Sequence, residues 1–165
     1  SKYKYKKLLK NKMICKSLAK LENVNKDLIA VVKKAIEITK VDFGVIYGVR
    51  TLDEQKKLYD AGRSQTMNSK HLIQDDGTCH AVDLMAYVGG SASWELNVYD
   101  DLADAMSEAA KQEGIKGLRW GASWHINDIS EWEGTMEEAM MAYVDLRRGQ
   151  GRRPFIDGPH FELMR

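Results

Sequence analysis

Short apolar runs of strand length alternate irregularly with amphipathic helical segments along this chain, and this pattern limits the fold more than any other feature. Apolar residues recur at helical spacing over 25–39 and again over 101–112. The strand-length runs are 43–49, 81–88, 118–120 and 161–164. The alternation lacks the regular rhythm of a parallel βαβ sheet. We therefore predict an α+β domain with a small, mainly antiparallel sheet flanked by helices.

Two further helices are indicated by local signals. Thr51 and Glu54 are spaced as a capping box, and Gly62 is a suitable stop, so a helix is predicted over 51–61. The Met- and Ala-rich segment 135–148 is also predicted to be helical.

The size and composition fit one soluble globular domain. The chain has 165 residues, of which 44% are hydrophobic, and this is enough to bury a core without cross-links. Two cysteines exclude a disulfide scaffold, and two prolines exclude a proline-rich linker. No uncharged run is long and apolar enough to cross a bilayer.

Charge is distributed unevenly along the chain. Residues 1–20 contain eight lysines and no acid, whereas residues 21–165 carry a net charge of −7. We interpret 1–20 as a lysine-rich arm that could contact an anionic envelope surface, or that is simply solvated, and 21–165 as the folded domain. The lysines are interspersed and no apolar stretch follows them, so we expect no signal peptide. The near-neutral total gives no reason to expect nucleic-acid binding.

The histidines are the residues most suggestive of chemistry. His71 and His80 precede Asp83 in one cluster, and His160 lies in Asp157-Gly158-Pro159-His160-Phe161-Glu162 near the end of the chain. Two histidines and one carboxylate make a three-ligand site with a position left for water, which is the arrangement of a catalytic zinc.

Strand geometry favours one set of ligands. His80 and Asp83 are three residues apart, so a regular strand places them on opposite faces, ~10 Å apart. His71, in the preceding loop, is free to fold back toward Asp83. We therefore predict His71, Asp83 and His160 as the zinc ligands. Glu162, on the same face as His160, could support it from outside the ligand shell.

Other residues receive simpler interpretations. His80 is predicted to be hydrogen-bonded or to line the cleft, His125 to lie at the surface, and Cys79 to be a small buried residue. Trp124 either lines a groove or packs in the core.

An ordered set of motifs resembles the M15 family of zinc peptidases, and in particular the phage endolysins that act as L-alanyl-D-glutamate peptidases. The likeness extends from about residue 17 to residue 163. The motifs are Val41-Asp42-Phe43, Gly48-Val49-Arg50-Thr51, Glu54-Gln55, Ser69-Lys70-His71-Leu72, His80-Ala81-Val82-Asp83-Leu84, Arg119-Trp120-Gly121 with Trp124, and Asp157-Gly158-Pro159-His160-Phe161-Glu162-Leu163.

The resemblance implies roles for five positions. It implies that His71, Asp83 and His160 hold zinc, in agreement with the strand argument. It implies that Asp157 is the catalytic base and that Arg50 sits beside the substrate carbonyl. An arginine always carries charge and can stabilise an oxyanion.

Three features depart from the family pattern. The spacing from His71 to Asp83 is five residues longer than usual, so we predict a bulging turn near 73–77, and Cys79 replaces the usual glycine. The stretch after Trp124 is long, and we interpret about 126–153 as an inserted segment that includes the helix 135–148. The lysine-rich arm is additional.

We expect a monomer. The resemblance implies a zinc peptidase, an endolysin that hydrolyses the L-alanyl-D-glutamate bond of the bacterial peptidoglycan stem peptide. It also implies synthesis in the host cytoplasm and release to the cell wall during host lysis. One alternative is a D,D-carboxypeptidase or D,D-dipeptidase of the same family, because pocket shape sets specificity. Another is a non-catalytic domain that binds wall peptides.

Overall fold

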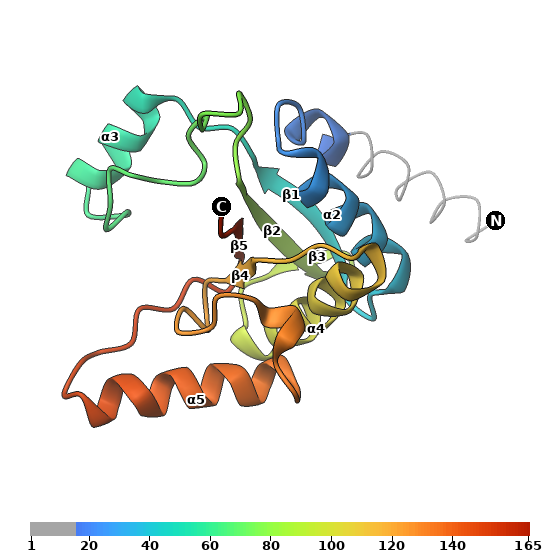
Figure 1. Cartoon of the computed structure of the whole chain (residues 1–165), viewed down its shortest axis with the longest axis vertical. Coiled ribbons are helices and arrows are strands. Elements are labelled where there is room, and N and C mark those ends of the chain that lie inside the picture. The colour runs from blue at the N-terminus through green and yellow to red at the C-terminus, as the bar shows by residue number, and fades with distance from the viewer. Residues whose placement is uncertain (1–15) are drawn as a thin grey trace.

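The computed structural model describes residues 16–165. Helices and short strands alternate along it in the predicted order (Figure 1). The elements are α2 (Lys26–Ile38), β1 (Asp42–Tyr47), α3 (Leu52–Asp60), β2 (Ala81–Val88), β3 (Ser91–Ser93), α4 (Leu96–Glu113), β4 (Leu118–Trp120), η1 (Ile129–Glu131), α5 (Met136–Gly149) and β5 (His160–Leu163). The α+β class is confirmed.

The sheet has the order β1-β2-β5-β4, and β3 pairs with the free part of β2. All four strand pairings are antiparallel, as predicted. The C-terminal strand β5 lies between β2 and β4, so the last residues of the chain reach the middle of the sheet. In this register Asp83 on β2 is directly opposite His160 on β5.

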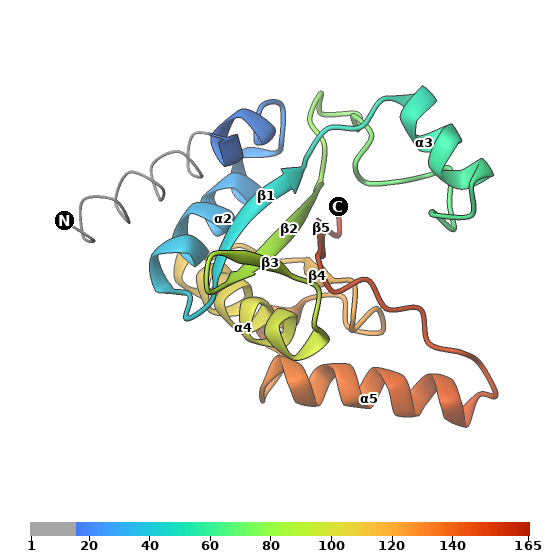
Figure 2. The ribbon, with the colours of Figure 1, turned by 180° about the vertical axis from the view of Figure 1, so that it is seen from behind.

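The core lies between one face of the sheet and helices α2 and α4, which are seen behind the strands in Figure 2. Alternate residues of β2 (Val82, Leu84 and Ala86) are fully buried on that side. Asp83, Met85 and Tyr87 are only partly buried, because they point to the other face. Strand alternation thus keeps the core apolar and presents Asp83 on the open face.

Helices α3 and α5 lie far apart, with β5 between them in both views (Figures 1 and 2). The predicted capping box is present in α3, where Thr51 accepts from the Glu54 amide and Glu54 accepts in return. A second capping box at Thr135 and Glu138 starts α5. The predicted helix 135–148 is confirmed within a residue.

Two elements differ from the prediction, and two predicted boundaries remain predictions. Helix α4 starts at Leu96, five residues before the predicted start, and the buried Tyr99 of this extra turn bonds to Ser93 and Ala86. The short, polar strand β3 was not predicted. The boundaries of the arm and of the inserted segment about 126–153 stay predictions, and residues 1–15 of the arm lie outside the described part of the chain.

Within residues 16–165, no helix has both the length and the apolar character that a membrane-spanning segment requires.

A buried carboxyl group on α4 makes the stability of the fold depend on pH. Burial, with Asp101, Glu137 and Asp104 nearby, raises the pKa of Asp100 from 3.8 to about 6. The folded state therefore binds this proton more tightly than the unfolded state. The stabilisation that protonated Asp100 provides is full below pH ~4. It is lost as the pH rises through the pKa that Asp100 has in the folded state.

We expect the substitution Asp100→Asn to raise the free energy of unfolding at pH 7.5 by about 1–2 kcal/mol. Near pH 3.5 the substitution should change much less, because Asp100 is then largely protonated in both states. Thermal unfolding at the two pH values measures this difference. Asp145→Asn, at an exposed position of α5, is the matched control. An equal effect of both substitutions would contradict the assignment to Asp100.

Candidate metal centre and its cleft

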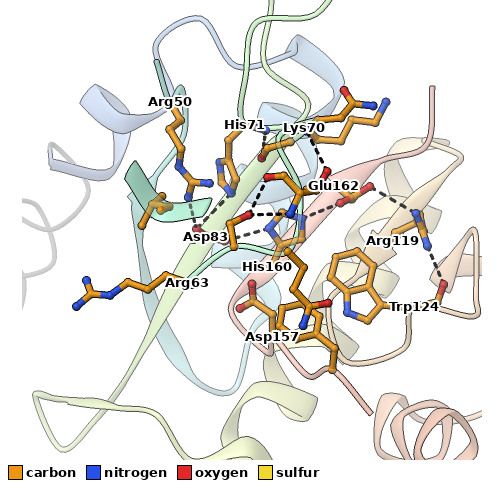
Figure 3. Close-up of a pocket in the computed structure, with 17 residues that line it drawn as sticks. Arg50, Arg63, Lys70, His71, Asp83, Arg119, Trp124, Asp157, His160 and Glu162 are labelled. Atoms are coloured by element: carbon orange, nitrogen blue, oxygen red, sulfur yellow. Dashed lines mark hydrogen bonds and ion pairs between the residues drawn. The ribbon is translucent and has the colours of Figure 1, made fainter. Parts of the chain in front are cut away.

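Three side chains from distant parts of the sequence converge on the open face of the sheet (Figure 3). His71 comes from the loop before β2, Asp83 from the middle of β2 and His160 from the start of β5. Each offers one ligand atom, and these atoms all lie within 4.8 Å of one another. The structure therefore brings together the three residues that the sequence analysis selected.

The ring of His71 is held in one orientation. Its Nδ1 lies 2.8 Å from the Gly48 carbonyl oxygen, which can only accept, so Nδ1 carries a proton. The Nε2 lone pair then faces Asp83 Oδ2 at 3.2 Å, and Nε2 is buried with no hydrogen-bond partner in the described part of the chain. An unprotonated Nε2 and a carboxylate oxygen at this distance are placed to share a cation, so this atom suits a metal ligand.

His160 is oriented in the same way by a different partner. Its Nε2 lies 2.8 Å from Glu162 Oε1, and its Nδ1 lies 3.2 Å from Asp83 Oδ1. Glu162 is in turn 3.6 Å from the guanidinium of Arg119. If Nε2 donates to Glu162, Nδ1 is the atom directed at the centre. A carboxylate behind a ligating histidine fixes its tautomer and increases its basicity.

The electrostatics of the centre favour positive charge. Burial alone raises the pKa of Asp83, but the adjacent His160 and His71 outweigh burial and hold that pKa well below its usual range. Burial lowers the pKa of His160, yet its contacts with Asp83 and Glu162 raise it to about 10. The carboxylates of Asp83 and Glu162 that raise this pKa also attract a metal cation, which would replace the proton on the imidazole. Two imidazoles and one carboxylate match the donor set of a catalytic zinc.

Asp157 lies at the edge of this centre, in the turn that leads to His160. Its backbone N–H donates to the Gly121 carbonyl at 2.7 Å, and the indole of Trp120 donates to the Gly158 carbonyl at 2.7 Å. A Cβ at position 121 would collide with the Asp157 carbonyl, so this close approach requires glycine. Burial raises the pKa of Asp157 above its usual value.

Arg50 follows β1 and reaches the opposite side of the centre. Its guanidinium lies 3.7 Å from Asp83 Oδ2 and also donates to Gln55 Oε1 at 2.7 Å. Its backbone N–H donates to the His71 carbonyl at 2.9 Å. A main-chain hydrogen bond therefore holds Arg50 next to His71.

The five predicted site residues border one cleft of about 420 Å³. Trp124 and Phe155 stack at 6.3 Å and form an aromatic wall beside His160. Arg119 supports this wall from behind, since it lies over the Trp124 ring and donates to the Trp124 carbonyl at 2.7 Å. The remaining lining residues are Leu58, Arg63, Ser64, Gln65, Thr66, Asn68, Ser69, Lys70 and Glu162.

The other histidines and Cys79 lie outside the metal group. His80 is buried and bonds to Asp76 at 2.8 Å, as its hydrogen-bonded interpretation requires. Cys79 is fully buried, and its thiol donates to the Ala81 carbonyl, which confirms the prediction of a small buried residue. The surface position predicted for His125 is wrong. This side chain is half-buried and stacks on Tyr143 of α5, which the sequence could not place near it.

The contributions of Gln55 and Phe155 to the cleft were not predicted from the sequence. Gln55 was quoted only as part of a motif, and a single polar residue on an amphipathic helix carries no signal of burial. Phe155 lies beyond α5, and only the path of the chain after this helix brings it back to Trp124.

Comparison with known proteins agrees with this geometry. A family model of the phage L-alanyl-D-glutamate peptidase matches residues 9–164. The L-alanyl-D-glutamate peptidase of Escherichia phage T5 is 31% identical over 111 residues, which cover 65% of this chain and 77% of that protein. The crystal structure of the Serratia marcescens L-Ala D-Glu endopeptidase ChiX is similar, with a TM-score of 0.63 and 31% identity. The match covers 90% of this chain and 86% of that one.

Proposed function

The chain belongs to the phage L-alanyl-D-glutamate peptidase family, and from this premise we propose that it is a zinc-dependent peptidase of bacterial peptidoglycan. Its reaction is hydrolysis of the L-alanyl-D-glutamate bond in the stem peptide. The observation that carries the proposal is the convergence of His71, Asp83 and His160 beside Asp157 in one cleft.

Zinc would be held by His71 Nε2, a carboxylate oxygen of Asp83 and His160 Nδ1. When bound, it supplies Lewis-acid activation of water and polarises the scissile carbonyl. The protein's part is to keep these atoms in place. Gly48 and Glu162 do so by fixing the two imidazole rings from behind.

We assign proton transfer to Asp157. Its carboxylate takes a proton from the attacking water and later delivers it to the amine of the leaving D-glutamyl residue. Partial burial suits this work, because a pKa raised toward neutrality makes the same carboxyl both a usable base and a usable acid.

We assign to Arg50 the stabilisation of the negative charge that develops on the carbonyl oxygen. We expect Arg50→Ala to lower kcat by ~100- to 1,000-fold, as loss of one oxyanion donor typically does. Steady-state kinetics on a purified stem peptide, together with zinc content, measure this effect. Arg50→Ala with normal zinc content and wild-type kcat would exclude this role for Arg50.

The proposal extends to the partner and the place of action. The substrate is the stem peptide of the wall, and the active form is a monomer that does not bind nucleic acid. The protein is made in the host cytoplasm and acts after release to the wall. The lysine-rich arm 1–20 offers electrostatic contact with anionic envelope components.

Mass spectrometry of digested peptidoglycan tests the function directly. The expected products are glycan fragments that end in L-alanine and peptides that begin with D-glutamate. Release of D-alanine alone would instead support the D,D-carboxypeptidase alternative. Binding of wall peptides without any cleavage would support the non-catalytic alternative.

A further inference from the structure

Helix α3 buries one side chain, and that side chain is polar. Gln55 is fully buried, whereas the other residues of α3 are exposed or only half-buried. Burying an amide is unfavourable unless its hydrogen bonds are replaced. The burial of Gln55 therefore indicates that hydrogen bonds, rather than apolar packing, explain its place on the helix.

The amide oxygen of Gln55 and its amide nitrogen are both hydrogen-bonded, and the partners allow one orientation of the amide. Gln55 Oε1 accepts from the guanidinium of Arg50 at 2.7 Å. Its Nε2 donates to Ser64 Oγ at 2.9 Å and to the Thr66 carbonyl at 2.6 Å. Because an arginine can only donate and a carbonyl can only accept, the oxygen must face Arg50 and the nitrogen must face Thr66.

This one amide connects two parts of the cleft wall. Arg50 lies beside Asp83 on one side, and the segment 63–66 lines the cleft on the other. The start of that segment is also fixed by the backbone, since the N–H groups of Arg63 and Ser64 both donate to the Leu58 carbonyl. Beyond this turn, the side chain of Gln55 is what ties the segment to Arg50.

We propose that Gln55 is a positioning residue that holds the Arg50 guanidinium at the reaction centre and fixes the cleft segment 63–66. This inference rests on the proposed function of the same site. A long arginine side chain has many rotamers, and a guanidinium that is already ordered loses little freedom when charge develops on the substrate. Displacement of such a group by ~1 Å can lower a rate ~100-fold.

The first test is a double-mutant cycle between Gln55→Leu and Arg50→Ala. Gln55→Leu keeps the size of the side chain but removes every hydrogen bond, so we expect kcat to fall by ~10- to 100-fold with normal zinc content. In the Arg50→Ala background the same change should lower kcat by less than ~2-fold, because the group it positions is already gone. An equal fall in both backgrounds would overturn the proposal, as would an unchanged kcat for Gln55→Leu alone.

Two further variants test separately the contact of the amide oxygen with Arg50 and the contacts of the amide nitrogen with the segment 63–66. Gln55→Glu keeps an acceptor for Arg50 but loses the donor to Thr66, so it should retain most of kcat and raise KM. Ser64→Ala removes one contact on the segment side and should affect KM alone. If Gln55→Glu loses kcat as severely as Gln55→Leu, Gln55 does not act by accepting from Arg50, and the proposal is wrong.

A measurement without substrate keeps this inference separate from the proposed function. ¹⁵N relaxation of the Arg50 guanidinium should show an ordered group in the wild type and a mobile one in Gln55→Leu. Equal order in both proteins would overturn the proposal even if the enzyme is active. A wild-type protein that does not cleave the stem peptide would instead contradict the proposed function.

Discussion

Replacement of Asp157 by alanine is expected to lower kcat by ~1,000-fold while the protein keeps its metal. Asp157 is the carboxyl group at the edge of the centre with a raised pKa, and loss of a general base or acid typically lowers rates by ~100- to 10,000-fold. The turn itself should persist, because its hydrogen bonds to Gly121 and His160 are made by the main chain of Asp157.

Kinetics and metal analysis on the same preparation check this prediction. The control is Asp75→Ala, which removes an exposed carboxylate on the turn before β2 and should leave kcat unchanged. A variant Asp157→Ala that cleaves as fast as the wild type would show that another group moves the proton. A variant that loses its metal would show that Asp157 is needed to build the site.

The second large effect is expected at Asp83. Asn has nearly the same shape but no charge, so Asp83→Asn leaves His71 and His160 around a neutral amide. Because Asp83 contacts both rings and Arg50, loss of its charge removes the main attraction for a cation. We expect activity to fall by at least ~1,000-fold, by analogy with loss of an essential catalytic group.

The effect of Asp83→Asn should depend on zinc concentration, which distinguishes a metal ligand from a structural residue. Titration with zinc should restore part of the activity, since two imidazoles remain, and should also raise the melting temperature, because a ligand stabilises the state that binds it. Activity that stays at the wild-type level in the presence of a chelator would rule out Asp83 as a ligand.

Local patterns were enough to predict most of the fold. The apolar run 81–88 became β2 with the same bounds. The capping residue Thr51 begins a helix as expected, and the predicted helix 135–148 agrees with α5 within a residue. The start of α4 was missed because apolar spacing indicated a helix only from residue 101, whereas the tertiary contacts of Tyr99 extend the helix toward its N-terminus. Strand β3 is stabilised by pairing with β2, and its small polar residues give no signal of their own.

Strand parity separated His80 from Asp83 in the sequence, whereas the pairing that places His160 opposite Asp83 is seen only in the structure. Asp83 on β2 and His160 on β5 are partners in the register, and such partners share a face. The role of Gln55 was not predictable from strand parity. It depends on the path of the loop 63–66, and no periodicity in the sequence reports where a loop returns. His125 was misplaced for the same reason, since its neighbour Tyr143 belongs to a separate helix.

The metal content of the purified protein tests the central claim most directly. Elemental analysis of the wild type should find one zinc per chain, and His160→Ala, if its melting temperature confirms that it is folded, should hold less than a tenth of that amount. Equal zinc in the two folded proteins, or no zinc bound by the wild type at any concentration, would contradict a metal centre built from His71, Asp83 and His160.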